Sequence, residues 1–225
     1  IRGGDRPLPE KVADAIERPF LIDCIRNGIA GQVVVLQAPS GFGKTELLAA
    51  AYEILPEPGD RFGWLTVSAV DANPAMFLDG IAAAFGLQPR PAIDRDIEAS
   101  AQRLLARLAE SGERFVLFLD EFQSAAGEAF FACCSVLFRH LPDNVRLVIA
   151  SNSRPDIPLS RFRLRGFLTE LLSGDLAFTR TEMRRLLGKR MAANELDAFA
   201  ELTGGWPALV QLAVPLLGKI GRAHV

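Results

Sequence analysis

The chain has 225 residues, of which 49% are hydrophobic, and a formal net charge of −2. This length and composition can supply a sizeable buried core, whereas the weak charge provides no general basic field for nucleic acid. No apolar run reaches the length of a membrane span and no signal peptide is visible, so we expect a soluble cytoplasmic protein with no membrane partner. Cys24, Cys133 and Cys134 lack metal-ligand spacing and are expected to be buried thiols in a reducing compartment.

Both ends of the chain look artificial. Ile1 is not a start methionine, and the last six residues, from Ile220 to Val225, resemble the translation of a common sequencing-adapter read-through. We therefore interpret this tail as a non-biological scar and expect the natural protein to continue beyond Lys219.

The first informative segment is RPFLID, from Arg18 to Asp23, which follows a short amphipathic run from Val12 to Ile16. Its pattern is compatible with a packing segment and equally with a nucleotide contact. The residues alone leave both interpretations open.

The segment QVVVLQAPSGFGKTELL, from Gln32 to Leu48, combines a strand, a glycine turn and the start of a helix. Glycines let such a loop curl so that the backbone N–H groups from Gly41 to Thr45 converge on one anion. Phe42 and Glu46 belong to the same turn and are assigned to the same site. The pattern predicts a cradle for a di- or triphosphate.

Two side chains of this loop extend the prediction. Lys44 can reach the β- and γ-phosphates, and the hydroxyl of Thr45 can bind Mg²⁺. The segment departs once from the pattern G-x-x-x-x-G-K-[ST], because Ala38 stands at the first glycine position. A glycine-rich turn with a surface lysine is the alternative interpretation.

Helices and strands alternate after the phosphate loop. We predict a helix ending at Leu55, a strand from Phe62 to Ala69, a helix from Ala75 to Phe85 with Asn73 as N-cap, a loop from Gln88 to Ala92, and a helix from Ile97 to Leu108.

RFVLFLDEFQ, from Arg114 to Gln123, is the second informative segment. Its apolar run from Phe115 to Leu119 is expected of a central parallel strand covered on both faces, and it ends in Asp120 and Glu121. Ligands of open α/β sheets bind at this edge, so Asp120 can hold Mg²⁺ through water and Glu121 can orient or deprotonate an attacking water. A solvated turn is the alternative interpretation.

The order of these segments predicts the fold class. One full strand, from Phe62 to Ala69, separates the phosphate-loop strand from the Asp-Glu strand along the chain. Together with Glu121 directly after Asp120, this order resembles the P-loop NTPase division that has an inserted central strand and a catalytic glutamate. We therefore predict a three-layer α/β sandwich around a parallel sheet.

The remaining part of the sheet is predicted from three apolar segments: a core helix from Gly127 to Leu141, a strand from Val145 to Ala150 and an edge strand from Leu168 to Leu172. Asn152 and Arg154 follow the second of these, where a polar side chain can sense a γ-phosphate. Arg161, Arg163 and Arg165 are interpreted as a solvated row, with an arginine-finger role as the alternative.

From Gly174 onward only helices are predicted. They run from Met183 to Lys189 behind a capping box at Thr179 to Glu182, from Glu195 to Leu202, and from Ala208 to Leu217. We place a domain boundary near Ser173. Residues 1–173 form the predicted nucleotide-binding domain, 174–219 a small helical lid and 220–225 the scar.

Taken together, these segments resemble the nucleotide-binding segment of the MalT-like, LuxR-type transcriptional regulators, a branch of the STAND signalling ATPases. The matching segments follow the family order over nearly the whole chain: RPFLIDCI, APSGFGKTELL, WLTVSAVDANPAMFL, FVLFLDEFQ, VRLVIASNSRP, RGFLTELLSGDLAFTRTE and TGGWPALVQLA. In that family a helical repeat domain that binds inducer and a C-terminal helix-turn-helix follow, and neither is present here.

The resemblance implies a binding site for ATP or ADP with Mg²⁺. It assigns the phosphates and the metal to Gly43, Lys44 and Thr45, and the second acidic motif to Asp120 and Glu121, where the family more often has two aspartates.

The resemblance also implies contacts around the nucleotide base. Pro207 matches a lid motif beside the base, and Arg18 with Pro19 matches the leader on its other side. Asn152 stands where the family has a phosphate-sensing arginine. Either Arg154 takes that role from two residues away or nucleotide sensing is weakened.

The family suggests a switch: ADP holds a closed form, ATP with inducer permits self-association, and slow hydrolysis using Glu121 and Lys44 resets it. DNA and the inducer would bind only through the missing domains. The alternative is a constitutively active AAA-like ATPase, a motor or remodelling enzyme, which Glu121 favours and which steady turnover without inducer would reveal. A degenerate nucleotide-binding scaffold is disfavoured by the intact Lys44, Thr45 and Asp120.

Overall fold

The computed structural model describes residues 16–88, 96–188 and 191–220. The run from Val12 to Ile16, the loop from Gln88 to Ala92 and the tail from Ile220 to Val225 therefore lie largely outside the described residues. Within the described ranges, no helix combines the length and the apolar character needed to cross a membrane.

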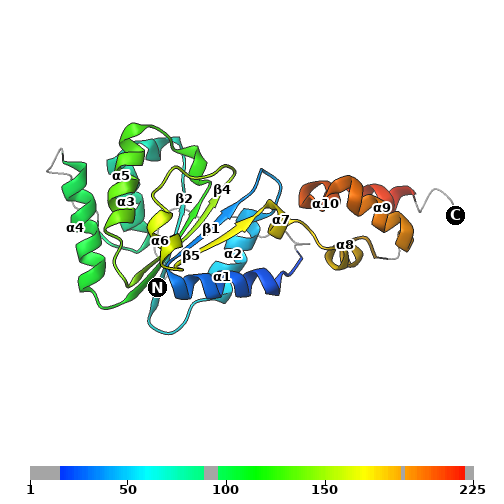
Figure 1. Ribbon diagram of the computed structural model, residues 1–225, viewed down its shortest axis with the longest axis horizontal. Coiled ribbons are helices and arrows are strands. Elements are labelled where there is room, and N and C mark those ends of the chain that lie inside the picture. The colour runs from blue at the N-terminus through cyan, green and yellow to red at the C-terminus, as the bar shows by residue number, and fades with distance from the viewer. Residues whose placement is uncertain (1–15, 89–95, 189–190, 221–225) are drawn as a thin grey trace.

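A parallel five-stranded sheet forms the centre of the molecule (Figure 1). Its strands are β1 (Val33–Gln37), β2 (Asp60–Thr66), β3 (Arg114–Asp120), β4 (Val145–Ser151) and β5 (Leu168–Leu172). Their spatial order is β2-β3-β4-β1-β5, with Val35 of β1 opposite Ile149 of β4 and Glu170 of β5. The predicted edge strand, β5, pairs with β1 alone and is confirmed.

The central inserted strand is present, but β4 supplies it. β4 lies between β1 and β3, whereas β2, the strand counted from the sequence, lies at the edge and pairs only with β3. Chain order does not dictate spatial order, because a helical crossover can carry the chain past a neighbouring position in a parallel sheet.

Helices cover both faces of the sheet, and the alternation of side chains along each strand separates two cores. Val34 and Leu36 pack on one face with α1 (Pro19–Gly31) and α2 (Lys44–Ile54). Val33 and Val35 pack on the other face, which is covered by α3 (Pro74–Ala84), α4 (Ile97–Glu110) and α5 (Glu128–Arg139). The predicted three-layer sandwich is confirmed.

The helix α1 was not predicted from the sequence. Pro19 occupies its first turn, and the buried Leu21, Ile22, Ile25 and Ile29 recur at helical spacing. That spacing was available in the sequence. The helix packs the leader segment directly against β1 and β5.

The C-terminal helices from residue 180 onward, which we call the helical lobe, lie beside the sheet (Figure 1). The helices after β5 are α7 (Ser173–Leu176), α8 (Arg180–Leu187), α9 (Ala193–Thr203) and α10 (Pro207–Ile220). Leu176 packs in the core of α1 and α2, whereas Phe178 opens a small cluster with Met183, Leu187, Leu196 and Val210. The domain boundary near Ser173 stays a prediction.

The predicted local signals at helix starts are present. Asn73 caps α3 by accepting a hydrogen bond from the N–H of Ala75 at 3.0 Å, and Thr179 with Glu182 forms the capping box of α8. Three short elements complete the chain: the 3₁₀ turns η1 (Ala69–Ala72) and η2 (Phe122–Ser124), and α6 (Ser160–Leu164).

Candidate functional site

The carboxyl ends of β1 and β3 carry the two motifs singled out in the sequence. The phosphate loop, residues 38–43, follows β1. Asp120 is the last residue of β3 and Glu121 follows it, and β4 lies between β3 and β1. The Oγ1 of Thr45 nevertheless donates a hydrogen bond of 3.2 Å to Oδ1 of Asp120. The fold therefore joins both motifs at one edge of the sheet.

The backbone of the phosphate loop depends on two glycines. Gly41 has φ 83° and Gly43 has φ 72°, a region that side-chain-bearing residues rarely adopt. Gly43 is the N-cap of α2, and in the described part of the chain no side chain caps the N–H groups of that helix start. These donors are thus available to an anion.

Lys44 is buried between this loop and three carboxylates. Only 7% of it is exposed, and its Nζ donates to the carbonyl oxygens of Ala38 at 2.7 Å and Pro39 at 3.1 Å. Burial lowers the pKa of Lys44, while the carboxylates, Glu121 first, oppose that change. A cation held in this position suits a polyphosphate ligand.

Asp120 and Thr45 are the residues that fit a metal ion. Asp120 is 2% exposed, and burial raises the pKa of its carboxyl against the opposing hydrogen bond from Thr45. The described residues contain no group of three or more His, Cys, Asp or Glu side chains that could hold a metal ion. A carboxylate with an adjacent hydroxyl fits Mg²⁺, which commonly takes one or two protein ligands with substrate phosphates and water.

Glu121 adopts an uncommon backbone conformation. Its φ of 53° is the only positive value at a non-glycine position among the described residues. Left-handed geometry at such a residue carries strain and is frequent at functional sites. The residue turns the chain from β3 into η2, and its side chain lines the same cavity as Lys44.

A cavity of about 610 Å³ lies beside the phosphate loop. Ten of the predicted site residues line it: Arg18, Pro19, Gly41, Phe42, Gly43, Lys44, Thr45, Glu46, Glu121 and Pro207. The wall also includes the apolar residues Ile16, Ile22, Ile54 and Phe178 and the charged residues Glu17, Asp23 and Arg26. This volume and mixed lining are typical of a small-molecule site.

The start of α10 contacts the phosphate loop directly, which the sequence interpretation missed. The backbone N–H of Ala208 donates to the carbonyl of Gly41 at 3.0 Å, and the indole Nε1 of Trp206 donates to the carbonyl of Ser40 at 3.2 Å. A Cβ at Gly41 would lie 2.7 Å from Cβ of Ala208. The helical lobe and the phosphate loop are therefore in contact through the protein itself.

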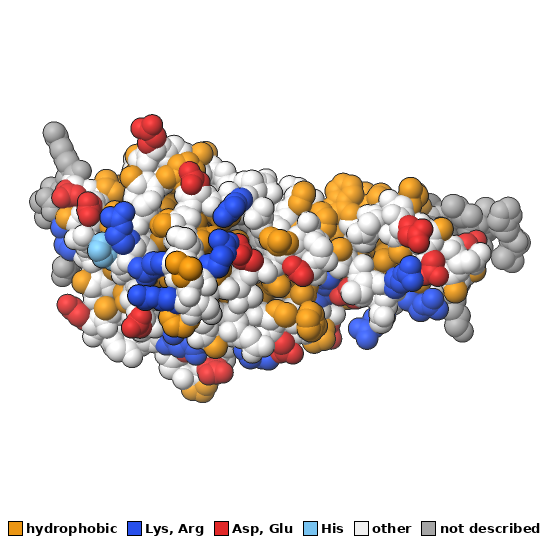
Figure 2. Space-filling model, in the orientation of Figure 1, with side chains coloured by type: hydrophobic (Ala, Val, Ile, Leu, Met, Phe, Trp, Pro, Cys, Tyr) orange, Lys and Arg blue, Asp and Glu red, His pale blue; other side chains and the backbone are white. Residues whose placement is uncertain are grey.

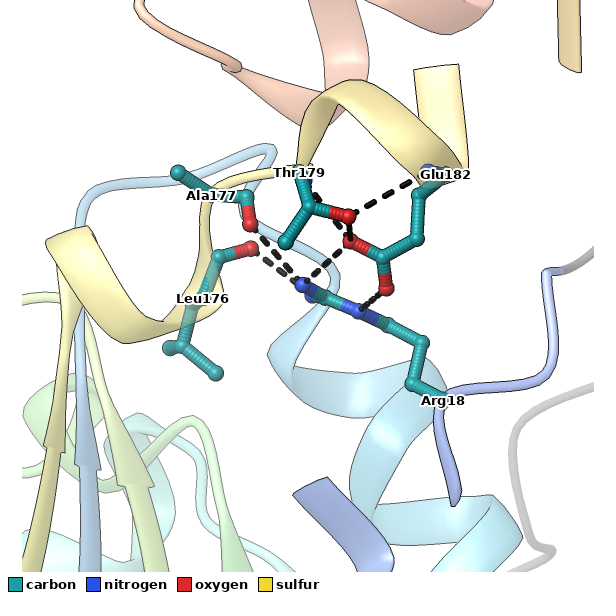
Figure 3. A network of polar contacts seen from close by, with 5 residues as sticks. All are labelled: Arg18, Leu176, Ala177, Thr179 and Glu182. Carbon is teal, nitrogen blue, oxygen red and sulfur yellow. Dashed lines mark hydrogen bonds and ion pairs between the residues drawn. The ribbon is translucent and has the colours of Figure 1, made fainter. Parts of the chain in front are cut away.

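Arg18 connects the leader to the helical lobe (Figure 3). Its Nε donates to Oε1 of Glu182 at 2.7 Å, and its other nitrogens donate to the carbonyls of Leu176 at 2.7 Å and Ala177 at 2.9 Å. The guanidinium also lies 5.2 Å from the ring centre of Phe178. Arg18 lines the cavity, but its guanidinium bonds to protein groups, and its contact with a nucleotide stays a prediction.

This ion pair predicts a pH-dependent stability. Burial acts to raise the pKa of Glu182, but hydrogen bonds from Arg18 and Thr179 outweigh burial and hold it below its ordinary value of 4.5. Because the pKa of Glu182 is lower in the folded state, its ionised carboxylate stabilises the fold at pH values above 4.5. This stabilisation is lost as the pH falls through the lower folded-state pKa. Glu182→Gln keeps an oxygen to cap α8 but removes the charge. We expect its urea midpoint to lie below that of the parent at pH 7 and to approach it below pH 4.5.

The matched control is Glu195→Gln. Glu195 accepts from the N–H of Ala192 at 2.8 Å in the same capping position of α9, and no arginine pairs with it among the described residues. A deficit of Glu182→Gln that is the same at pH 7 and pH 4 would contradict the assigned role of the ion pair.

The two predicted sensor residues lie outside the cavity lining. Asn152 and Arg154 are exposed after β4, and the backbone N–H of Asn152 donates to Gln123. The buried polar group at this strand end is the hydroxyl of Ser151, which has no hydrogen-bond partner in the described part of the chain. Whether Asn152 or Arg154 senses a phosphate, or nucleotide sensing is weakened, stays a prediction.

Two members of the arginine row, Arg163 and Arg165, are exposed, whereas Arg161 is half-buried. Figure 2 shows basic side chains gathered over the region of α6. Arg163 makes two hydrogen bonds of 2.8 Å to Glu170, and Arg161 donates to the carbonyl of Arg139. Arg165 is exposed, and none of the three lines the cavity.

Comparison with known proteins shows similarity in sequence to MalT regulators. No protein-family model matches the chain. The HTH-type transcriptional regulator MalT of Vibrio cholerae is 26% identical over 223 residues, which cover 91% of this chain and 24% of the regulator. The serine/threonine-protein kinase PknK of Mycobacterium tuberculosis is 26% identical over 224 residues, covering 92% of this chain and 20% of the kinase. The chain thus spans about a quarter of these relatives or less.

Solved structures with a similar fold include a signal transduction ATPase and two ORC proteins. A STAND protein with a tetratricopeptide repeat sensor from Pyrococcus horikoshii aligns with a TM-score of 0.53 and 18% identity, over 92% of this chain and 31% of that one. The ORC1 protein of Aeropyrum pernix, solved in complex with DNA, aligns with a TM-score of 0.57 and 18% identity, over 97% and 64%. The ORC2 protein of Aeropyrum pernix, solved with ADPNP and ADP, has a TM-score of 0.54 and 16% identity, over 98% and 66%. The predicted α/β P-loop NTPase fold and the resemblance to MalT-like regulators are confirmed.

Proposed function

We propose that this chain is the ATP-binding and slowly hydrolysing switch module of a signal-responsive transcriptional activator. The observation that carries the proposal is the composition of the cavity wall. The phosphate loop contributes one side, and the leader with the start of α10 contributes the other. A nucleotide bound there would contact the sheet domain and the helical lobe together.

The residues present fit a nucleoside triphosphate with Mg²⁺. The free N–H groups of residues 41–45 and the ammonium of Lys44 would hold the phosphates, and Thr45 and Asp120 would hold the metal. The ion, when bound, would neutralise phosphate charge. The apolar wall with Phe178, together with Pro19 and Pro207, would receive the base. The nucleotides in the solved ORC2 structure support this use of the fold.

Glu121 is the group we assign to the chemical step. Its carboxylate lines the cavity near Lys44 and can orient or deprotonate the attacking water. Lys44 stabilises the charge that develops on the phosphate oxygens. Asp120 is bonded to Thr45 and would act only on the metal.

The proposed switch would work through the hydrogen bonds between the sheet domain and the helical lobe. Trp206 and Ala208 hold the phosphate loop, and Arg18 holds the start of α8. A ligand that interacts differently with the open and closed arrangements shifts the population between them. ADP would favour the closed form, and ATP with inducer would favour an open form that self-associates. DNA and inducer would bind through other segments, because the chain spans only 24% of the MalT relative.

Intrinsic fluorescence tests nucleotide binding and lobe contact together. The chain has two tryptophans: Trp206 is 40% exposed at the phosphate loop, and Trp64 is 4% exposed in the sheet core. We expect ADP with Mg²⁺ to change the emission of the parent, because the ligand would bind at the phosphate loop, to which the indole of Trp206 donates a hydrogen bond at Ser40. Trp206→Phe should remove this change, and the control Trp64→Phe should retain it. Absence of ADP and ATP binding by the parent in isothermal titration calorimetry would contradict the proposed function.

A further inference from the structure

Gln123 bonds with both ends of its side-chain amide. Its Nε2 donates to Oε2 of Glu121 at 2.5 Å, and its Oε1 accepts from the backbone N–H of Asn152 at 2.9 Å. Turning the amide over would direct its oxygen at a carboxylate and its NH₂ group at an N–H. Only one orientation therefore satisfies both partners. In that orientation, Gln123 ties Glu121 to the carboxyl end of β4.

The hydrogen bond from Gln123 orients the side chain of Glu121, which lies just beyond the end of β3. Glu121 follows the last residue of β3 and has a left-handed backbone, so regular strand geometry does not set the direction of its carboxylate. In the described part of the chain, no group other than Gln123 donates a hydrogen bond to this carboxylate. The direction of Glu121 thus depends on one neighbour.

The second hydrogen-bond partner of Gln123 lies at the end of a strand in the middle of the sheet. Asn152 directly follows β4, which is paired on both sides, with β1 and with β3. The bond uses the backbone of Asn152 and is independent of its side chain. Through its two hydrogen bonds, Gln123 therefore fixes the carboxylate of Glu121 relative to the end of β4.

We infer that Gln123 is a positioning residue for ATP hydrolysis. It holds the carboxylate of Glu121 toward the cavity, where the attacking water must lie. The inference rests on the proposed function, because it gives Glu121 its neighbour in the hydrolytic step. Gln123 does not line the cavity, so it acts through Glu121 and not on the nucleotide.

Two substitutions separate the two bonds. Gln123→Leu removes both of them. Gln123→Glu has nearly the same shape and keeps an oxygen for the N–H of Asn152, but it replaces the donor to Glu121 with a second carboxylate. The control is Gln102→Leu on α4, because Gln102 also donates to a glutamate, Glu98, but is exposed and distant from the cavity lining.

Single-turnover hydrolysis of radiolabelled ATP with Mg²⁺ and excess protein tests the inference, with nucleotide affinity and melting temperature measured in parallel. Both Gln123 variants should hydrolyse ATP about 10–100-fold more slowly than the parent, because misplacement of a catalytic group by about 1 Å costs this order of rate. Their affinity for ATP should not change, since neither variant removes a ligand contact. The Gln102→Leu control should behave as the parent. In a Glu121→Gln background, Gln123→Leu should cause no further slowing.

The outcomes separate the inference from the proposed function. If Glu121→Gln slows hydrolysis while both Gln123 variants match the parent, the positioning role is wrong and the proposed function stands. If a Gln123 variant loses ATP affinity and melting temperature in proportion to rate, its role is structural and the inference is overturned. A parent that binds no nucleotide contradicts the proposed function first. A parent that binds ATP without hydrolysing it overturns the inference and leaves nucleotide binding intact.

Discussion

Glu121→Gln is expected to slow ATP hydrolysis by about 10²–10³-fold, within the range that a positioned acid or base contributes. The amide has the shape of the carboxylate but cannot accept the proton of the attacking water. ATP affinity should stay near that of the parent, because the assigned contacts to phosphate and metal come from other residues. The measurement is single-turnover hydrolysis together with a direct titration of ATP in the presence of Mg²⁺.

Asp120→Asn should have the opposite profile. The carboxylate of Asp120 accepts a hydrogen bond from Thr45 and is assigned to the metal. Its loss should therefore weaken Mg²⁺-dependent ATP binding more than it slows hydrolysis of ATP that is already bound. Glu110→Gln is the matched control, since Glu110 is exposed at the end of α4 and distant from the cavity. An equal loss of affinity in Asp120→Asn and Glu121→Gln would contradict the division of roles.

Lys44→Ala should abolish most of the stabilisation that ADP gives to the parent. A ligand at one hundred times its Kd stabilises a folded protein by about 2.7 kcal/mol. Each kcal/mol shifts the melting temperature of a domain of this size by about 2–4 °C, so ADP with Mg²⁺ should raise that of the parent by about 5–10 °C. Lys44 supplies the buried cation that we assign to the β-phosphate. Without it, only backbone N–H groups would remain to hold the phosphates.

Pro207→Ala is the comparison for this experiment. Pro207 lines the cavity from α10, so its substitution should reduce the rise less than Lys44→Ala does, mainly by loosening the lobe. Differential scanning calorimetry with and without ADP measures all three proteins. A parent whose melting temperature is unchanged by ADP, or an undiminished rise in Lys44→Ala, would contradict the assignment of the cavity to a nucleotide.

Most elements were predictable because their signals are local. The β-branched run in β1, the apolar run in β3 and the caps at Asn73 and Thr179 each act within a few residues. α1 was not predicted although its apolar spacing is helical, because it has no side-chain cap at its start and no charged residue in its first or last turn to mark its ends. The sheet order was only partly predictable, since chain order does not decide which strand a crossover bypasses.

In the candidate site, too, the local motifs were predictable and the contacts between distant segments were not. The phosphate loop and the Asp120-Glu121 pair are contiguous motifs. The first predicts phosphate binding, and the second predicts metal binding and activation of water. The role of Gln123 was not visible, although it stands in the quoted segment, because its partner at Asn152 is 29 residues away. Trp206 likewise stands in a quoted segment, but its bond to Ser40 was not visible because that partner is 166 residues away.

The sequence by itself determined which residues could bind phosphate and metal, since glycine geometry, a lysine and a strand-end carboxylate are properties of short segments. Only the tertiary structure decided what those residues contact. Arg18 meets Glu182 across 164 residues, and Trp206 meets Ser40 across 166. Such contacts depend on how the sheet and the helical lobe pack as whole bodies, and no short-range pattern encodes that arrangement. The same packing directs the charge of Arg18 to the lobe and brings the start of α10 onto the phosphate loop.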